Sequence, residues 1–239
     1  MDNAVYTTLN RQSGLMTEMR AVANNIANLS TTGFRREGVI FAEHVAALGR
    51  GEPSLSLASA EGRIVDLAQG PMVRTGGAFD LAIEGEGFFQ IDTSAGPRLT
   101  RAGDFMPSAE GELVTVDGAR LLDLSGAPVL VPVDAGEVAV APDGTVSVAG
   151  NPVARIGIFR PLDPSGLVHS GGTRFEAVGG VEPAEGGTIF QGYLENSNVN
   201  PVTEIARMIE VQRAYEMGQG FLDREDERIR AVIQTLGRR

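Results

Sequence analysis

The last forty residues, Asn200–Arg239, read NPVTEIARMIEVQRAYEMGQGFLDREDERIRAVIQTLGRR. Asn200 and Pro201 predict a helix start, because an Asn side chain caps free N–H groups and Pro at the first helical position loses no hydrogen bond. Apolar residues then recur every seven positions, which predicts a helix of about 37 residues, roughly 55 Å long. An average globular helix has only about 12 residues, so the apolar stripe needs a second long helix, from this chain or from a neighbouring copy. The stripe consists of Met208, Tyr215, Leu222, Ile229 and Leu236, flanked by Ile205, Ile209, Val211, Val232 and Ile233.

Residues 3–29 carry a second helical pattern, with a period of about 3.5 residues. Gln12 occupies the remaining position of its seam, and Gly33 is a stop signal just beyond it. Because these are the two long periodic stretches of the sequence, we expect them to pair as one coiled-coil module made of residues 1–33 and 200–239. The apolar positions of the first pattern are Val5, Leu9, Met16, Met19, Ala23 and Ile26.

Three asparagines near the end of the first helix, Asn24, Asn25 and Asn28, are poor helix formers that compete for the backbone. They indicate either fraying of the helix end or side-chain hydrogen bonds to neighbouring helices, and the sequence does not decide between the two.

The middle of the chain changes to a period of two. Residues 34–77 are expected to form an extended connector with room for a short helix at 37–48, and residues 78–199 an antiparallel β domain. Turns centred on Asp117-Gly118 and Asp143-Gly144 predict hairpins. The predicted fold class is therefore α+β, with long N- and C-terminal helices paired as a coiled-coil module that encloses an antiparallel all-β middle domain. The strand candidates are residues 88–92, 112–116, 137–141, 145–149, 153–159 and 174–177.

Composition and charge narrow the classes of function. The 239 residues are 42% hydrophobic, enough for a core, and the net charge of −11 argues against nucleic acid or an anionic membrane surface as the main partner. Both termini hold equal numbers of acidic and basic residues, so the excess acid lies in the middle, and we expect the ends to contact protein. Without Cys, disulfides and thiolate chemistry are excluded. No signal peptide or membrane span is predicted, which by itself indicates a cytoplasmic protein.

No set of residues predicts catalysis, a metal site or a cofactor. The two histidines, His44 and His169, are far apart in sequence, and Gly85-Glu86-Gly87 lacks the third Gly of a nucleotide fingerprint. Asp223 and Asp226 lie in an Arg-rich helix, so paired surface charge explains them better than acid–base chemistry. We predict that the chain is not an enzyme.

Three separated blocks resemble the flagellar basal-body rod and hook protein family. Residues 23–35, ANNIANLSTTGFR, resemble its N-terminal signature, and residues 194–201, LENSNVNP, followed by Gln212-Arg213-Ala214-Tyr215-Glu216, resemble its C-terminal signature. Residues 83–89 and 99–105 are similar to the β domain of its longer members. Thr32 stands where the family usually has Pro, which affects only how sharply the chain turns there. The motif positions carried by the resemblance are Asn24, Asn25, Asn28, Gly33, Phe34, Asn198, Val199, Gln212 and Arg213.

The resemblance implies a structural subunit of the flagellar rod that crosses the periplasm, assembles with copies of itself and with other rod proteins, and helps to transmit torque from motor to hook. The opening Met1–Tyr6 and the modest length look most like the proximal-rod type. Family members are exported through the flagellar type III apparatus without a cleaved signal, which accounts for the missing signal peptide and overrides the cytoplasmic interpretation. A distal-rod or hook-type paralogue, or a trimeric fibre-like protein, stays an alternative; a wall-digesting β-fold hydrolase lacks a convergent catalytic set.

Two hypotheses concern the helices. Gly218-Gln219-Gly220 and Glu225-Asp226 interrupt the C-terminal seam, so we expect both ends to be poorly ordered in the free subunit and to fold on assembly. The second concerns charges at spacings of three and four, which form pairs within the helix or between subunits. These charges are Glu204, Arg207, Glu210, Arg213, Arg224, Glu227 and Arg228.

Overall fold

A computed structural model describes residues 2–46, 55–132 and 136–236 and separates the chain into two compact units. Unit 1 comprises Met1–Ala27, Glu37–Ile64 and Asn200–Arg239, and unit 2 comprises Asn28–Arg36 and Val65–Val199. The chain therefore passes from one unit to the other four times.

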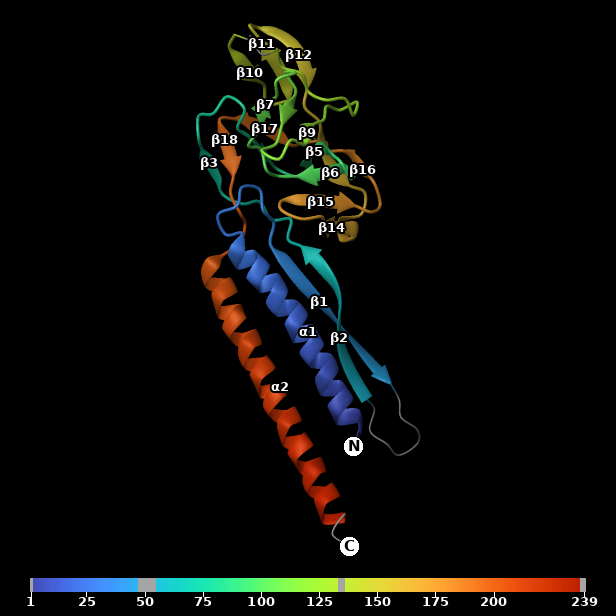
Figure 1. The fold of residues 1–239 in the computed structure, drawn as a ribbon. Coiled ribbons are helices and arrows are strands. Elements are labelled where there is room, and N and C mark those ends of the chain that lie inside the picture. Colours follow the sequence, from blue (N-terminus) through green and yellow to red (C-terminus); the bar gives the residue numbers. More distant parts are fainter. Residues whose placement is uncertain (1, 47–54, 133–135, 237–239) are drawn as a thin grey trace. The chain divides into compact units, whose positions relative to one another are not determined.

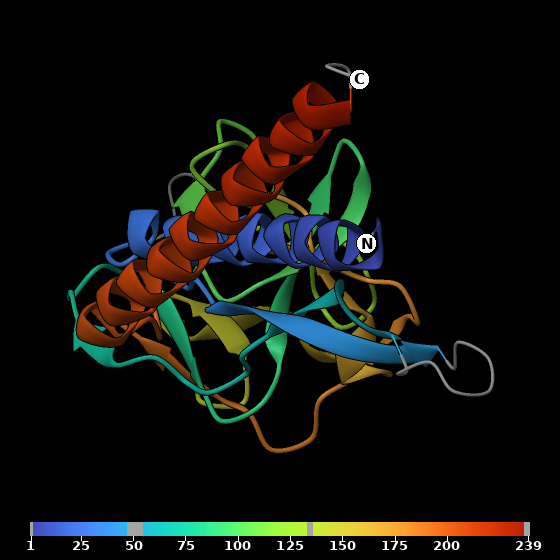
Figure 2. The same ribbon diagram turned by 90° about the horizontal axis from the view of Figure 1, so that it is seen from below.

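Unit 1 contains both long helices and a β-hairpin. Helix α1 spans Asp2–Ala27, helix α2 spans Pro201–Leu236, and strands β1 (Glu37–Ala46) and β2 (Leu55–Val65) pair with each other. The predicted helix start is confirmed, because Oδ1 of Asn200 accepts hydrogen bonds from the N–H groups of Val202 at 3.0 Å and Thr203 at 3.2 Å. The helices lie side by side, with the hairpin along α1 (Figure 1), and α2 crosses α1 obliquely (Figure 2).

Unit 2 is built from short antiparallel strands joined by turns. A nine-stranded sheet runs β14-β15-β6-β5-β9-β8-β7, with β13 pairing to β5 and β16, and smaller sheets are β10-β11-β12, β17-β4 and β18-β3. The strand bounds are β3 Met72–Arg74, β4 Leu81–Glu84, β5 Phe88–Thr93, β6 Gly96–Thr100, β7 Met106–Pro107, β8 Leu113–Val114, β9 Arg120–Leu121, β10 Val138–Val140, β11 Thr145–Val148, β12 Asn151–Arg155, β13 Ile158–Pro161, β14 Leu167–His169, β15 Arg174–Ala177, β16 Val181–Pro183, β17 Thr188–Gln191 and β18 Tyr193–Glu195, with a 3-10 turn at Pro164–Gly166.

The core of unit 2 lies along the central strands. Phe89 and Ile91 of β5 point to one buried cluster, whereas Phe88 of the same strand joins a second cluster with Phe159 and Phe175. Alternate side chains of a strand point to opposite faces, so β5 is covered on both sides. This two-sided burial explains why apolar residues run consecutively here instead of alternating with polar ones.

The predicted fold class is wrong. The chain does not consist of a coiled-coil module enclosing an all-β middle, because a β-hairpin shares unit 1 with the helices and the antiparallel strands form five sheets spread over both units. Glu37–Ala46 is strand β1, where a short helix was expected. The run Val39-Ile40-Phe41 explains the difference, because β-branched and aromatic side chains favour strands. Within the described residues, α1 and α2 are the only α-helices.

Both predicted hairpin turns are confirmed. Strands β8 and β9 pair across Asp117-Gly118, and β10 and β11 pair across Asp143-Gly144, with φ of +84° at Gly118 and +87° at Gly144. The expected strand at residues 153–159 is divided between β12 and β13, which belong to different sheets.

Candidate assembly site

The two helices contact each other through polar side chains. The side-chain Nε2 of Gln12 donates to the carbonyl oxygen of Tyr215 at 3.0 Å, and Nε of Arg207 donates to Oε1 of Glu18 at 2.6 Å. Further along, Asn25 contacts Glu204. Positions that ascend in α1 meet positions that descend in α2, so the helices are antiparallel.

Asn25 lies at the centre of a buried polar cluster in unit 1. Its Oδ1 accepts from the N–H of Glu37 at 2.9 Å, and its Nδ2 donates to the carbonyl of Glu37 at 2.9 Å and to Oε2 of Glu204 at 3.1 Å. One amide therefore joins α1, β1 and α2. For Asn25 the structure decides in favour of side-chain hydrogen bonding rather than fraying.

The apolar positions named as packing residues do not form a continuous buried seam. Val211 and Gln12, which the two patterns include, are buried, and so are Ala21, Val22 and the polar Glu18, Asn25 and Glu204. The seven-residue repeat identified the buried face of each helix only in part, because small and polar residues lie where the two helices approach each other most closely. Of the named residues, Leu9, Ile205, Ile209, Ile229 and Leu236 are exposed, Met16, Met19, Ile26, Met208, Tyr215 and Leu222 are half-buried, and the side chain of Val5 lies outside the described residues.

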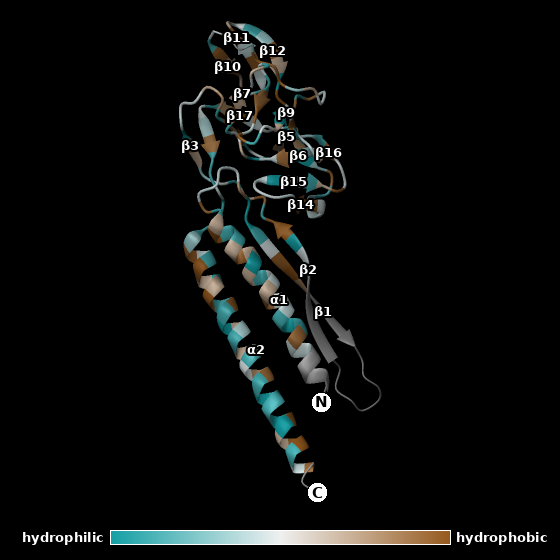
Figure 3. Ribbon diagram, viewed as in Figure 1, coloured by the Kyte–Doolittle hydropathy of each residue, from teal (hydrophilic) through white to brown (hydrophobic). Residues whose placement is uncertain are grey.

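The end of α2 extends beyond α1. The antiparallel register of Gln12, Glu18 and Asn25 with their partners places the first residue of α1 opposite the turn around Glu225, because both helices rise by the same distance per residue. Residues 226–236, here named the α2 tip, are exposed throughout. Figure 3 shows apolar residues among the hydrophilic ones in this part of α2. They are Ile229, Val232, Ile233 and Leu236, with exposed fractions of 48%, 53%, 62% and 68%.

A groove of about 320 Å³ lies between α1 and α2. Leu15, Ala214 and Phe221 give it apolar walls, and Met217, which is exposed, stands at its edge. Gly218 opposes Gln12, whose Oε1 is buried without a hydrogen-bond partner. This interhelical groove is lined by Thr8, Arg11, Gln12, Leu15, Ala214, Met217, Gly218 and Phe221.

Several other signature residues, among them Gly33, Phe34 and Asn198, meet in unit 2. Gly33 donates its N–H to the carbonyl of Glu195 at 2.7 Å, and Asn198 donates its N–H to the carbonyl of Phe34 at 3.3 Å. Phe34 is fully buried, and its ring contacts that of His169 edge-on at 5.9 Å. The N- and C-terminal signatures are therefore bound to each other where they leave unit 2.

Glu195 holds two buried arginines at this meeting point. One carboxylate oxygen contacts Nη1 of Arg35 at 2.8 Å and accepts from the N–H of Gly70, and the other contacts Nη1 of Arg101 at 3.0 Å. Burial lowers the pKa of Arg35, and it lowers the pKa of Arg101 to about 10, against the opposing effect of Glu195. The cluster thus joins all three sequence blocks of the resemblance.

Sequence reasoning did not single out Arg35, Arg101 or Glu195. The available signal was only that each is a charged residue inside a recognised block. Charged residues are almost never fully buried unless they are paired, and pairing across such sequence separations is not visible in one sequence.

Asn198 and Val199 occupy the end of unit 2 that leads to α2. The Asn198 side chain accepts from the N–H of Arg36 at 2.7 Å and donates to the carbonyls of Asp66 at 3.0 Å and Ala68 at 2.8 Å, while Val199 is buried. Asn28 accepts a hydrogen bond from Thr31 at 3.0 Å, and Asn24 is half-buried in α1. These contacts assign structural roles to asparagines that the signature only marked.

The charged residues of α2 divide into two groups. Arg207, Glu204 and Arg228 have partners inside the unit, in Glu18, Asn25 and Glu225 respectively. Arg213 is exposed, and the neighbouring Gln212 donates to Glu216 at 3.1 Å. Arg213 is therefore the better placed of these cations for a contact with another subunit.

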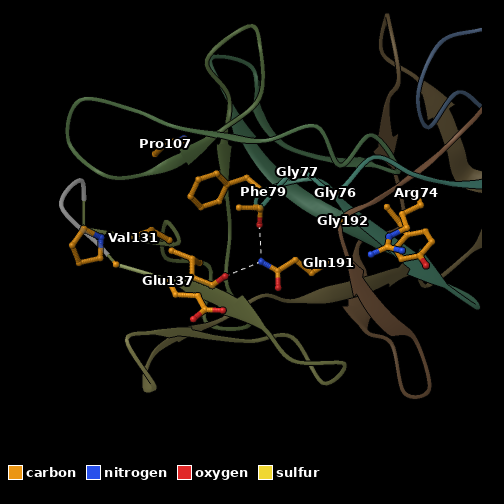
Figure 4. Close-up of a pocket in the computed structure, with 14 residues that line it drawn as sticks. Arg74, Gly76, Gly77, Phe79, Pro107, Val131, Glu137, Gln191 and Gly192 are labelled. Atoms are coloured by element: carbon orange, nitrogen blue, oxygen red, sulfur yellow. Dashed lines mark hydrogen bonds between the residues drawn. The ribbon is translucent and has the colours of Figure 1, made fainter.

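A pocket of unit 2 lies between β17 and the three-stranded sheet (Figure 4). Its volume is about 850 Å³, and Gln191 donates across it to the carbonyls of Ala78 and Val138 while accepting from the N–H of Val140. The amide of Gln191 thus joins two parts of the fold. Among the described residues, no group of three or more His, Asp or Glu side chains could hold a metal ion, and no helix is long and apolar enough to cross a membrane.

Comparisons with known proteins match the same three blocks. The family model described as "Flagella basal body rod protein" matches residues 6–35, the "Flagellar hook protein FlgE/F/G D1 domain" matches residues 82–148, and the "Flagellar basal body rod FlgEFG protein C-terminal" matches residues 191–235. The chain is 40% identical to the flagellar basal-body rod protein FlgF of Caulobacter vibrioides, over 100% of this chain and 99% of that protein. It is 35% identical to FlgF of Mesorhizobium japonicum, over 99% of both chains, and 29% identical to FlgG of Bacillus subtilis, over 98% of both.

Proposed function

Because this chain belongs to the flagellar basal-body rod protein family and is a structural subunit of that rod, we propose that it joins the rod through the helices of unit 1. It is most like the relatives named FlgF, and like them it is a structural protein rather than an enzyme. Its proposed partners are copies of itself and other rod proteins, and its proposed position is the proximal rod, where it transmits torque toward the hook.

The observation that carries this proposal is the exposed apolar stripe of the α2 tip. Ile229, Val232 and Ile233 lie on one helix face with nothing from α1 opposite them. Exposed aliphatic side chains in a contiguous stripe mark an interaction surface, since their burial is favourable by roughly 25 cal/mol per Å² of apolar area removed from water. The near-neutral charge of the tip leaves no strong repulsion between subunits.

Residues named as packing positions by sequence enter this proposal as contacts with neighbours. Leu9 of α1 and Ile205 and Ile209 of α2 are exposed. Arg213 is also exposed and lies in α2 between Ile209 and the α2 tip. We assign these residues to contacts with adjacent rod subunits. Reversing Arg213 abolishes swimming under this assignment, and reversing its acidic partner on the neighbour restores it.

The rod position implies a route out of the cytoplasm. We propose that the chain passes through the flagellar type III export apparatus without a cleaved signal and comes to rest in the part of the rod that crosses the periplasm. Folding of the helix ends on arrival fits this route, because an exposed helix end without tertiary contacts is marginal in water. Limited proteolysis of the free subunit tests this step: rapid cleavage within residues 226–236 is expected, and resistance there contradicts it.

Complementation of a strain that lacks its own copy tests the proposed function. A variant with Ile229, Val232, Ile233 and Leu236 all changed to Ser is expected to be absent from purified basal bodies and to leave cells unable to swim in soft agar. The control changes Glu227 and Gln234 to Ser, because these exposed residues lie on the opposite face of the same turns. Swimming by the stripe variant at the level of the control refutes the proposal.

A further inference from the structure

The α2 tip and the interhelical groove are complementary surfaces on the same molecule. We propose that the tip of one copy docks in the groove of a second copy of this chain, so that each subunit both inserts a tip and receives one. This inference rests on the proposed function and adds to it the identity of the two contacting surfaces.

The tip continues an interface that already exists. Val211 and Gly218 lie on the face of α2 that contacts α1, and residues seven positions apart stay on nearly the same face of a helix. Continuing this spacing from Gly218 reaches Glu225 and then Val232, with Ile229 and Leu236 beside it. The surface of α2 that packs on α1 therefore continues beyond the end of α1, and there it is exposed.

The groove has the chemistry and the length to receive this stripe. Its walls are aliphatic and aromatic, from Leu15, Ala214 and Phe221, and Met217 at its edge has a flexible side chain that can close over an inserted residue. A volume of about 320 Å³ corresponds to about ten water molecules, which apolar side chains would release. Along α2 the groove runs from Ala214 to Phe221, about 11 Å, and the apolar stripe of the tip, from Ile229 to Leu236, spans about the same length.

A tip cannot reach the groove of its own chain. Met217 and Ile233 are separated along one continuous helix by about 24 Å, so contact between them requires two molecules. In the proposed contact the tip of each copy enters the groove of the next, which makes it heterologous. Repeated by a rotation that does not close into a ring, it produces an open helical chain of subunits. An open chain is the geometry that a rod requires.

The absence of Cys from the sequence allows a direct test by site-specific cross-linking. The double variant Met217→Cys/Ile233→Cys is produced in cells lacking the native copy, basal bodies are isolated, and a short bismaleimide reagent is added. We expect a ladder of dimers, trimers and larger species on a denaturing gel, because each subunit carries both halves of the contact. Each single variant is expected to yield at most dimers.

The matched control is Glu216→Cys/Ile233→Cys. Glu216 is next to Met217 in α2 but does not line the groove. A ladder of equal intensity in this control, dimers alone in the test variant, or cross-links only to a different rod protein each overturn the inference. A second test variant, Ala214→Cys/Val232→Cys, gives the same ladder if the inference is correct, even if the first variant is poorly incorporated. Absence of any ladder in cells that swim removes only this inference, whereas swimming by the four-serine variant removes the proposed function.

Discussion

Glu195 is the residue on which unit 2 depends most. It is 1% exposed and is the shared counterion of Arg35 and Arg101, which are themselves almost fully buried. Removing one partner of a buried ion pair leaves an uncompensated charge, which costs about 3–5 kcal/mol. One residue of the cluster comes from each of the three sequence blocks, so the loss of Glu195 affects all three.

We expect Glu195→Gln to lower the free energy of unfolding by about 3–5 kcal/mol, because two guanidinium groups then share a buried site without a carboxylate. Urea unfolding of the purified chain measures the change. Glu182→Gln is the control, since Glu182 pairs with Arg160 at 2.7 Å on the surface, where such a pair contributes about 0–1 kcal/mol. Equal losses in the two variants would show that the buried cluster has no special role.

Gly33 illustrates a backbone requirement inside a signature. Its φ is +68°, and a Cβ there would lie 2.1 Å from the backbone nitrogen of Ala102. Gly33→Ala is therefore expected to disrupt unit 2, whereas Gly118→Ala, with φ of +84° but open space around it, loses only the roughly 1–2 kcal/mol of a left-handed conformation. Thermal unfolding distinguishes the two, and a smaller loss at Gly33 than at Gly118 contradicts the assigned close approach.

Asp104 supplies a pH dependence with a definite sign. Partial burial raises the pKa of its carboxyl, and the nearby Asp80 raises it further. A carboxyl with a raised pKa in the folded chain stabilises the fold below its unfolded-state pKa of about 3.9, and this contribution is lost as pH rises through the folded-state value.

Asp104→Asn is therefore expected to raise the free energy of unfolding at pH 7, with the gain shrinking as pH falls toward about 4. Asp143→Asn should do the reverse, because hydrogen bonds from Thr145 lower the pKa of Asp143. Its stabilising effect is present above the unfolded-state pKa and is lost as pH falls through the lower folded-state value. Urea titrations at the two pH values check both signs, and parallel changes in the two variants would refute them.

At the scale of elements, the two glycines that interrupt α2 differ in their surroundings. A Cβ at Gly218 would lie 2.5 Å from Nε2 of Gln12, whereas nothing lies within 4 Å of one at Gly220. Gly218 is therefore part of the contact between the helices, whereas a side chain at Gly220 would meet open space.

We expect Gly220→Ala to stabilise α2 by about 0.5–1 kcal/mol, because Ala is the better helix former. Gly218→Ala is expected to lose stability, since Gln12 must move and give up its hydrogen bond to Tyr215. Helix unfolding followed by circular dichroism compares the two variants. Equal stabilisation by both would place Gln12 away from α2.

Elements with strong local signals could be predicted from the sequence, and those fixed by distant contacts could not. Asn200-Pro201 determines the start of α2 by local capping, and Asp117-Gly118 determines a hairpin by its permitted φ. Residues 37–48 were expected to leave room for a short helix, yet Glu37–Ala46 is a strand paired with β2. Which segment pairs with β1 depends on a contact that a single sequence does not specify.

The candidate site shows the same division. The seven-residue repeat predicted two long helices, and α1 and α2 are present. Leu9, Ile205 and Ile209, which it named as packing positions, are exposed in the isolated chain, so their contact with a neighbouring subunit stays a prediction. Gln12, Glu18 and Asn25 are buried because hydrogen bonds and ion pairs across the helices satisfy them. Which polar residue finds a partner depends on the antiparallel register, which hydrophobic spacing does not specify.

At the scale of the whole molecule, the family assignment supplied what local physics could not. Residue patterns led to paired ends and a β-rich middle, whereas the rod came from the resemblance and is supported by relatives matching the full chain. The export route comes from the resemblance alone and stays a prediction. In the structure, Asn25 and Glu195 have hydrogen-bond or ion-pair partners within the subunit, whereas Ile233 is exposed in the isolated chain.

The central claim is that the α2 tip is an assembly surface that becomes buried in the rod. A cryo-electron microscopy reconstruction of the basal body, at a resolution that shows side chains, tests it most directly. The account predicts that Ile229, Val232, Ile233 and Leu236 of this chain are all covered by a neighbouring subunit, from exposed fractions of about one half to two thirds in the isolated chain. A rod in which these four side chains remain exposed to solvent would contradict it.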